Sequence, residues 1–331
     1  MSNSVWQIQE SDFPTNGSIE EKIKFWLGYA ILAPSAHNTQ PWTYKIDGNV
    51  VTVKRDPDHT LKVGDPTLRE TFLGLGAFIE NFVTAASHWK YRATVTYTAH
   101  HPQDLDVATI SLSEGGSLSD TQFTGITKRH TNRGLFQSDI DEVTLSTLKV
   151  ESEDGIELFF ITEPEMKAEI GALVARGTHI ALSMRPMKEE MAELVSRHHE
   201  AKPTGMTVES MTETQTKSDG KTWTLQEMNG QKEGHANNNK FATAPVICVV
   251  ASEYDDPEAW LKAGRVMERV LLTAATHNLV HDISAAPVEI PTLLPLLRQK
   301  INPELRPQAL FRLGTPQNPD FTHNSNRRPV E

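Results

Sequence analysis

Apolar residues at helical spacing predict several long helices along the chain. Ser18 and Glu21 form a capping pattern, and the apolar positions that follow recur at three- and four-residue steps up to Ile31. A second helix is expected to begin at Asp65-Pro66, with proline at its first position, and to reach about Ala86. Further helices fit residues 141–148, 164–184, 257–277 and 291–300, with Asn278 closing the helix that starts at residue 257.

Alternating apolar and polar residues predict strands between these helices. Residues 43–46 and 50–54 alternate around Asp47-Gly48-Asn49, which is typical of a hairpin. Further strands fit residues 93–97, 107–112, 156–161, 245–251 and 308–313. Residues 185–240 are different, because they are rich in Met, Lys, Glu, Thr and Asn and hold few apolar residues. A segment of this length inside a compact domain is usually a functional lid, an exchange arm or disordered.

Composition narrows the class of protein. The 331 residues are 38% hydrophobic and 23% charged, which is normal for one large or two ordinary globular domains. The net charge of −11 and the lack of a basic run argue against a nucleic-acid partner. Cys248 is the only cysteine, so neither an intrachain disulfide nor a cysteine-based metal cluster is expected. We find no apolar run of membrane-spanning length and no signal peptide, so we expect no membrane partner and a cytoplasmic location.

The stretch from Ala33 to Trp42 is the most unusual part of the sequence. It places five hydrogen-bonding side chains in six positions, between Pro34 and Pro41. Proline, serine and asparagine together are common in turns. Amides beside hydroxyls also suit a flat heterocycle that carries carbonyls and ring nitrogens. Composition alone supports both interpretations equally.

This stretch, read as A-P-S-x-x-N-x-Q-P-W, resembles the flavin-binding signature of the nitroreductase family. Residues 128–136 are similar to the R-R-S-x-R-x-F phosphate motif of the same family, with His130 in place of an arginine. In ordinary members the phosphate motif comes first, whereas here it comes second. This order and the chain length resemble the fused, single-chain subgroup typified by the mycobacterial Acg proteins. The resemblance covers most of residues 18–317 and is weak from about 185 to 240.

The resemblance implies an α+β, nitroreductase-like fold, in which long helices flank a central, mainly antiparallel sheet. It also implies an internal pseudo-dimer of two half-repeats, residues 18–117 and residues 122–331, with a lid or arm inserted at about 185–240. Residues 77–87 and 265–276 share a spacing of apolar and small residues, which two unrelated amphipathic helices would also show. The family resemblance favours duplication.

The cofactor implied by the resemblance is FMN, held at one composite site between the halves. Two arginines four positions apart are by themselves more often a solvated face or ion-pair partners, and the basic C-terminal tail fits a solvated tail equally well. Within the resemblance, Arg129 and Thr131 would meet the phosphate or ribityl chain, and Arg133 the N1–C2 edge of the ring. Ser284 and Ala285 are the nearest candidates to offer a backbone N–H to N5. The complete set of implied cofactor-binding residues is Pro34, Ser35, Asn38, Gln40, Arg129, Thr131, Arg133, Ser284, Ala285, Arg327 and Arg328.

The implied function is an FMN-dependent oxidoreductase that uses NAD(P)H to reduce nitroaromatics, quinones or a similar flat acceptor. The flavin carries the hydride chemistry in such enzymes, so we expect no catalytic side chain and no metal. The alternative is a non-catalytic protein that binds or sequesters flavin, with residues 185–240 as a lid over it. The expected partner is a small-molecule acceptor, and association into a homodimer is left open.

Overall fold

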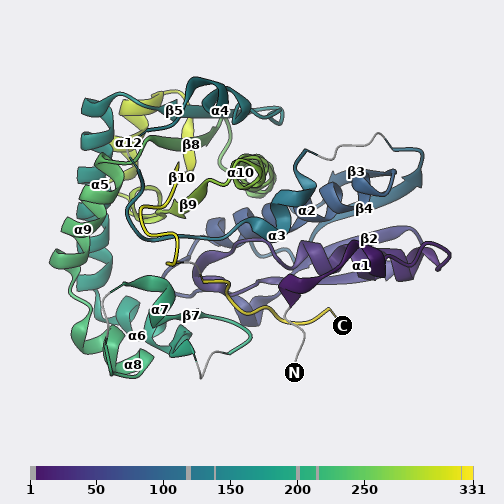
Figure 1. Ribbon diagram of the computed structural model, residues 1–331, viewed down its shortest axis with the longest axis horizontal. Coiled ribbons are helices and arrows are strands. Elements are labelled where there is room, and N and C mark those ends of the chain that lie inside the picture. The colour runs from purple at the N-terminus through teal and green to yellow at the C-terminus, as the bar shows by residue number, and fades with distance from the viewer. Residues whose placement is uncertain are drawn as a thin grey trace.

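The computed structural model describes residues 5–116, 121–137, 139–198, 202–213, 216–321 and 323–330. Ser117 and Glu331, the predicted ends of the two halves, lie outside these residues. Figure 1 shows the early and late parts of the chain side by side, with helix α10 (Pro257–Thr276) seen end-on between them.

The first half forms one antiparallel sheet in the strand order β1-β2-β4-β3, on which two helices pack. The predicted capping box is confirmed, because Ser18 accepts from the backbone N–H of Glu21 and the Glu21 carboxylate accepts from that of Ser18. The predicted hairpin is confirmed as well, and Gly48 in its turn has a φ of 55°. The elements are α1 (Ile19–Ala30), β1 (Trp42–Asp47), β2 (Val50–Arg55), α2 (Arg69–His88), β3 (Tyr91–Tyr97) and β4 (Asp106–Glu114).

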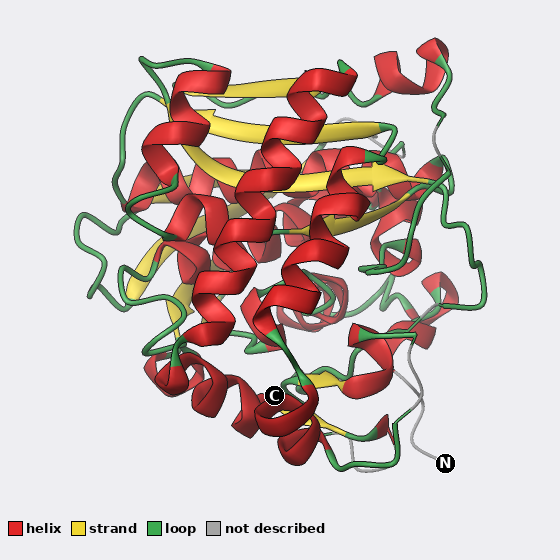
Figure 2. Ribbon diagram, turned by 90° about the vertical axis from the view of Figure 1, so that its left-hand side faces the viewer, coloured by secondary structure: helices red, strands yellow, loops and turns green. Residues whose placement is uncertain are grey.

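The second half forms another four-stranded antiparallel sheet, in the order β5-β8-β10-β9. Strand β8 is buried along its whole length, because helices cover both faces of this sheet. Figure 2 shows two long helices side by side in front of its strands, which are α5 and α9. The elements outside residues 185–242 are α3 (Phe123–Lys128), α4 (Glu142–Thr147), β5 (Ile156–Ile161), α5 (Pro164–Ser183), β8 (Val246–Ser252), α10, β9 (Val280–Ile283), α11 (Ala286–Glu289), α12 (Leu294–Ile301) and β10 (Arg306–Gly314).

Helices α2 and α10 pack against each other where the two halves meet. A Cβ atom on Gly264 would lie 2.2 Å from the carbonyl oxygen of Leu73, and one on Gly76 would lie 2.2 Å from that of Leu261. Both positions therefore require glycine. Buried charge pairs add to the contact, because the Glu80 carboxylate on α2 accepts from Arg265 at 2.8 Å and from Arg269 at 2.7 Å on α10.

The α+β class and the antiparallel pairing are confirmed, but the single central sheet is wrong. Strands pair only within their own half of the described chain, so two separate four-stranded sheets form, and α2 and α10 fill the space between them. In both four-stranded sheets the strands, numbered by their chain order within the sheet, run first-second-fourth-third. This shared order is what an internal duplication requires, and the duplication itself stays a prediction.

Two predicted helix starts are wrong. Helix α2 begins at Arg69 because Leu68, with a φ of 65°, breaks the helical path before it. The Asp65 carboxylate instead accepts from the backbone N–H groups of Glu70 at 3.1 Å and Thr71 at 2.7 Å, and so caps the helix from a distance. Helix α12 begins at Leu294 and not at residue 291.

The described residues between 185 and 242 form helices and short strands, with a small apolar cluster of their own. Trp223 is buried in this cluster together with Met191, Met206 and Met228. Helix α9 packs along α5 and belongs to the scaffold of the second half, so only residues 185–228, the covering segment, stand apart (Figure 1). The elements are α6 (Arg185–Leu194), β6 (Val195–Ser196), β7 (Met206–Thr207), α7 (Val208–Met211), α8 (Gly220–Thr222), a π-helical turn (Trp223–Glu227) and α9 (Gly230–Ala242).

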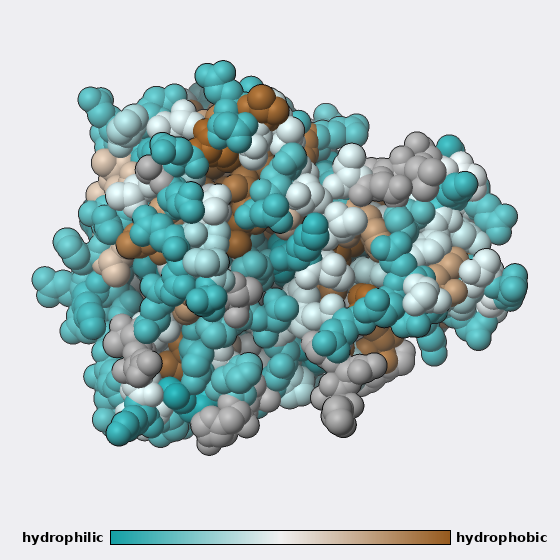
Figure 3. Space-filling view, viewed as in Figure 1, coloured by the Kyte–Doolittle hydropathy of each residue, from teal (hydrophilic) through white to brown (hydrophobic). Residues whose placement is uncertain are grey.

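The face seen in Figure 3 is mostly hydrophilic, with hydrophobic residues in scattered groups. Among the described residues, no helix is both long enough and apolar enough to cross a membrane.

Candidate functional site

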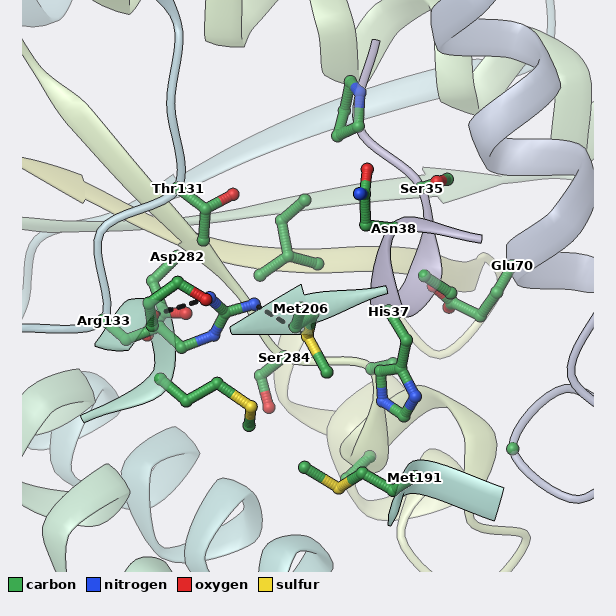
Figure 4. Close-up of a pocket in the computed structure, with 18 of the residues that line it drawn as sticks. Ser35, His37, Asn38, Glu70, Thr131, Arg133, Met191, Met206, Asp282 and Ser284 are labelled. Carbon is green, nitrogen blue, oxygen red and sulfur yellow. Dashed lines mark hydrogen bonds between the residues drawn. The ribbon is translucent and has the colours of Figure 1, made fainter. Parts of the chain in front are cut away.

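A cavity of about 370 Å³ lies between the two halves and the covering segment. Its walls come from the signature stretch, the second motif, the segment after β9, and helices α2, α5 and α9. Figure 4 shows Arg133 and Asp282 on one side of it, and Glu70 with His37 on the other. The cavity is lined by nine of the eleven predicted cofactor-binding residues, namely Pro34, Ser35, Asn38, Arg129, Thr131, Arg133, Ser284, Ala285 and Arg327.

The signature stretch reaches the cavity in an unusual backbone conformation. His37, Asn38 and Gln40 have φ values of 48°, 55° and 56°, in the left-handed region that side chains disfavour. The Ser35 hydroxyl oxygen accepts from the backbone N–H of Gln40 at 2.9 Å and holds this turn closed. Strained backbone of this kind tends to occur at functional sites.

Asn38 uses its amide on protein partners. Its Nδ2 donates to the carbonyl oxygens of Gly205 at 2.9 Å and Asn326 at 3.0 Å, and its Oδ1 accepts from Arg327 at 2.8 Å. Arg327 also donates to the carbonyl oxygens of residues 31–33, at the C-terminal end of α1. The C-terminal tail is therefore fastened to the signature stretch by buried bonds and is not a solvated tail.

Gln40 and Arg328 do not line the cavity. Gln40 is fully buried, donates to the carbonyl oxygen of Pro203 at 2.7 Å, and accepts from the backbone N–H of Arg328 at 2.7 Å. The Arg328 guanidinium pairs with Asp56 at 2.8 Å. These two residues join the signature stretch to the covering segment and the tail, so the structure places them behind the cavity wall.

The two arginines of the second motif differ in their surroundings. Arg129 is 3% exposed, donates to the carbonyl oxygen of Leu32 at 2.7 Å, and lies 3.4 Å from the Glu268 carboxylate. Arg133 is partly exposed to the cavity and donates to the carbonyl oxygen of Ser210 at 3.0 Å. Thr131 contacts the His281 ring at 3.1 Å. Arg129 thus ties the halves together, whereas Arg133 has a side facing the cavity.

The segment after β9 distinguishes between the two candidate N–H donors. The backbone N–H of Ser284 donates to the carbonyl oxygen of Leu310 at 2.9 Å and is already used in the sheet. The N–H of Ala285 makes no hydrogen bond within the part of the chain that the structure describes. Ala285 is therefore the candidate that fits. The N–H of Ser284 is not available to a ligand, because the Leu310 carbonyl oxygen already accepts it.

One end of the cavity is cationic. Arg133 and Lys240 both line it, while Asp282 is held by Arg312 at 2.9 Å. Burial lowers the pKa of Lys240 from its ordinary value. The three basic groups Arg133, Lys240 and Arg312 outnumber the two nearby carboxylates, Asp282 and Glu233, so this end attracts an anionic ligand.

The opposite end is acidic. Arg69 donates to Glu70 at 3.0 Å and also to Glu289, and both glutamates line the cavity. Burial raises the pKa of Glu70, and the nearby charges of Glu289 and Asp65 raise it further against the opposing effect of Arg69. Burial, with the charge of Glu289, raises the pKa of Asp65 to about 6. Burial lowers the pKa of His37 to about 4, so His37 is neutral at physiological pH.

Methionine side chains make up much of the apolar wall. Six of the nine methionines in the sequence line the cavity, which are Met187, Met191, Met206, Met211, Met228 and Met267. All but Met267 come from the covering segment. Methionine is flexible and polarisable, and it suits walls that adapt to flat ligands of different outline.

Sequence reasoning missed Glu70, Glu289 and Lys240. A glutamate in the first turn of a helix is ordinarily a response to the helix dipole, and a lysine on a polar helix is ordinarily solvated. Nothing in the local sequence shows that these residues face one cavity.

The chain is similar over nearly its whole length to a Mycobacterium tuberculosis protein that is named as an NAD(P)H nitroreductase, Acg. The two are 24% identical over 318 residues, which is 93% of this chain and 94% of that protein. The resemblance to the Acg-like nitroreductases is confirmed. No family model matches the chain.

Two solved structures show a partial likeness. A nitroreductase of Anabaena variabilis aligns with 81% of this chain and 69% of its own, at 12% identity and a TM-score of 0.47. A Bacteroides fragilis nitroreductase with bound FMN aligns with 63% of this chain and 96% of its own, at 11% identity and a TM-score of 0.40.

Proposed function

We propose that this chain is an FMN-dependent oxidoreductase that uses NAD(P)H to reduce nitroaromatics, quinones or a similar flat acceptor. The observation that carries the proposal is the single cavity into which one half of the chain brings the signature stretch and the other half brings Arg133. The similarity to Acg, which is named as an NAD(P)H nitroreductase, supports it.

The donor set of the cavity fits FMN. Arg133 and Lys240 supply positive charge for a phosphate or for a reduced ring that has become anionic. The N–H of Ala285, which no described residue accepts, can donate to the ring, and methionines offer an apolar wall for it. The chain has no dinucleotide fingerprint, which favours FMN over FAD.

When bound, FMN supplies the hydride chemistry. The chain's own residues bind and orient the two reactants and exclude water from them. The covering segment is suited to this task, because the Glu190 carboxylate on α6 accepts from the backbone N–H groups of residues 62–64 on the far side of the cavity. Asn38 and Gln40 hold the same segment near Gly205 and Pro203.

These fastenings also favour a second candidate function, a protein that holds flavin without turning it over. A covering segment bound by several hydrogen bonds on both sides of the cavity slows exchange of whatever lies beneath it. Both functions share the same site and differ only in whether an acceptor reaches the flavin.

One preparation of purified protein tests both candidate functions, the oxidoreductase and the flavin-holding protein. We expect a yellow protein from which mass spectrometry identifies FMN at one per chain, with menadione-dependent oxidation of NADH or NADPH. FMN without turnover would support the flavin-holding alternative. An adenine-containing flavin, or a colourless protein that takes up no FMN, would refute both. The division into half-repeats, a homodimer and a cytoplasmic location stay predictions from the sequence.

A further inference from the structure

Three carboxyl groups surround one guanidinium at the acidic end of the cavity. Asp65 is 1% exposed, and the side chains of Arg69, Glu70 and Glu289 are 5%, 12% and 14% exposed. Arg69 donates to both glutamates, and Asp65, which precedes the helix, accepts from the N–H groups of Glu70 and Thr71 in its first turn. One positive charge cannot balance three carboxylates in a site with so little water, so the cluster favours retention of a proton.

The location of that proton follows from a second contact. Glu70 and Glu289 accept from the same nitrogen of the Arg69 guanidinium, Nη2, so their carboxyl groups lie beside each other. Two ionised carboxylates at such close range repel each other, so the pair favours one shared proton. Asp65 binds a proton less readily than this pair, because its carboxylate already accepts from two backbone N–H groups and from the Thr71 hydroxyl. All three hydrogen bonds favour its ionised form.

The proton faces the cavity. Glu70 and Glu289 both line it, and Figure 4 shows Glu70 reaching toward its interior above His37. His37 has too low a pKa to compete for the proton, and Glu190, the other carboxylate near it, is engaged by the backbone of residues 62–64.

We propose that Glu70 and Glu289 share one proton and present it to the cavity, where it is donated to an oxygen atom of the bound acceptor. The inference rests on the proposed function and narrows its substrate class to acceptors that carry a carbonyl or nitro oxygen. Reduction of a quinone to a hydroquinone adds one hydride and one proton. The hydride brings the electron pair, and the Glu70 O–H bond breaks as the hydroquinone O–H bond forms. The carboxylate that remains regains its proton from water.

The test separates binding from proton delivery. Affinity for menadione is measured by calorimetry on the oxidised protein between pH 6 and 9.5, without NAD(P)H, so no turnover takes place. We expect wild-type affinity to fall about tenfold as the shared proton is lost at high pH, the worth of one good hydrogen bond. Glu70→Gln retains an N–H donor, so its affinity should stay near the low-pH value of the wild type at every pH. Its menadione reduction should nevertheless be slower by about 100-fold or more, because an amide cannot deliver a proton.

Two further variants keep the test decisive. Glu289→Gln removes the neighbouring negative charge, so the pH at which affinity falls should shift downward. Glu157→Gln is the control, because Glu157 is exposed on β5 and is not among the residues that line the cavity, and its pH profile should equal that of the wild type. Wild-type affinity that is independent of pH, or a Glu70→Gln protein that reduces menadione at the wild-type rate, would overturn the inference. Failure of the proposed function would instead appear as no reduction by the wild type, with the pH-dependent binding intact.

Discussion

The Arg327 guanidinium donates to the side-chain oxygen of Asn38 at 2.8 Å across 289 positions of sequence. Arg327 in turn holds the carbonyl oxygens at the end of α1, while Asn38 donates to Gly205 in the covering segment. One asparagine therefore joins the signature stretch, the C-terminal tail and the covering segment. The signature asparagine organises the walls of the site, whether or not it also meets the flavin.

The first prediction concerns this asparagine. Asn38→Leu should lower the free energy of unfolding by about 1–3 kcal/mol even without FMN, because buried carbonyl groups and Arg327 lose their partner. FMN occupancy should fall as well. Urea denaturation with and without FMN measures both effects, and Asn239→Leu on the exposed side of α9 serves as control, with a change within about 0.5 kcal/mol. A loss of FMN affinity with unchanged stability of the FMN-free protein would show that Asn38 acts only on the ring.

The two arginines of the second motif should separate into a structural and a ligand-binding residue. Arg129→Met leaves the fully buried Glu268 without its cation, which should cost about 3–5 kcal/mol of stability. Arg133→Ala removes a charge that faces the cavity, so FMN affinity should fall about tenfold or more with a smaller loss of stability. Fluorescence titration and urea denaturation of both variants compare the two effects. The opposite ranking would mean that Arg129 carries the flavin contact.

Local signals in the sequence were sufficient to predict most of the helices and strands of the scaffold. The Ser18–Glu21 capping box, the hairpin at Gly48 and the helix closed by Asn278 each depend on residues close together in the chain. Helix α9 was missed because its stability comes from packing on α5. A Cβ on Gly171 would lie 2.7 Å from the Asn238 side chain, and one on Gly234 would lie 2.7 Å from the carbonyl oxygen of Ala175. A helix held by such contacts needs no apolar periodicity of its own.

The candidate site was predicted only as far as its motifs reach. The signature stretch and the arginine motif, which are contiguous patterns, both line one cavity, and their role in cofactor binding stays a prediction. The acidic end was not predictable, since Arg69 and Glu289 are 220 positions apart and meet only after the halves have packed. The positions of Gln40 and Arg328 outside the cavity lining were not predictable for the same reason, because their partners are distant in sequence.

The third prediction concerns pH. Burial raises the pKa of Glu268 to about 7, against the opposing effect of Arg129. The pKa of Glu268 is higher in the folded than in the unfolded protein. The stability that Glu268 contributes is therefore complete below about pH 4.5 and is lost as pH rises through about 7. Between pH 5 and 8, the free energy of unfolding of Glu268→Gln should therefore fall by about 2 kcal/mol less than that of the wild type. Urea denaturation across this range measures the slope. An unchanged slope would mean that Glu268 stays ionised throughout.

The fourth prediction tests how the halves are joined. Gly264→Ala places a methyl group 2.2 Å from the backbone oxygen of Leu73, which cannot move without shifting α2. We expect a loss of about 1–3 kcal/mol or more. Gly28→Ala is the matched control in α1, because its methyl group would meet only the flexible end of Ile8 at 2.8 Å, and alanine is the better helix former. Equal stability of the two variants would show that α2 and α10 are free to move apart.

The last prediction concerns the covering segment. The backbone gives a natural place to remove it, because Gly230, at the start of α9, lies beside the end of α5. A Cβ on Gly230 would be 3.1 Å from the carbonyl oxygen of His179 and 3.2 Å from the Leu182 side chain. A short Gly/Ser linker can therefore replace residues 185–228 and join Met184 to Asn229. The apolar cluster of the segment leaves with it, so the two sheets and their cores should remain folded.

Removal of residues 185–228 should open the cavity, because five of its methionines and the Ser210 partner of Arg133 leave together. FMN should then dissociate about tenfold faster or more, as stopped-flow fluorescence can measure. An excision that continues to residue 242 is the control: it removes α9 and exposes the face of α5 on which α9 packs, so circular dichroism should show a loss of the fold. Collapse of the shorter excision would mean that the covering segment belongs to the core. A folded protein with unchanged FMN release would mean that ligands leave the cavity by a route that the covering segment does not close.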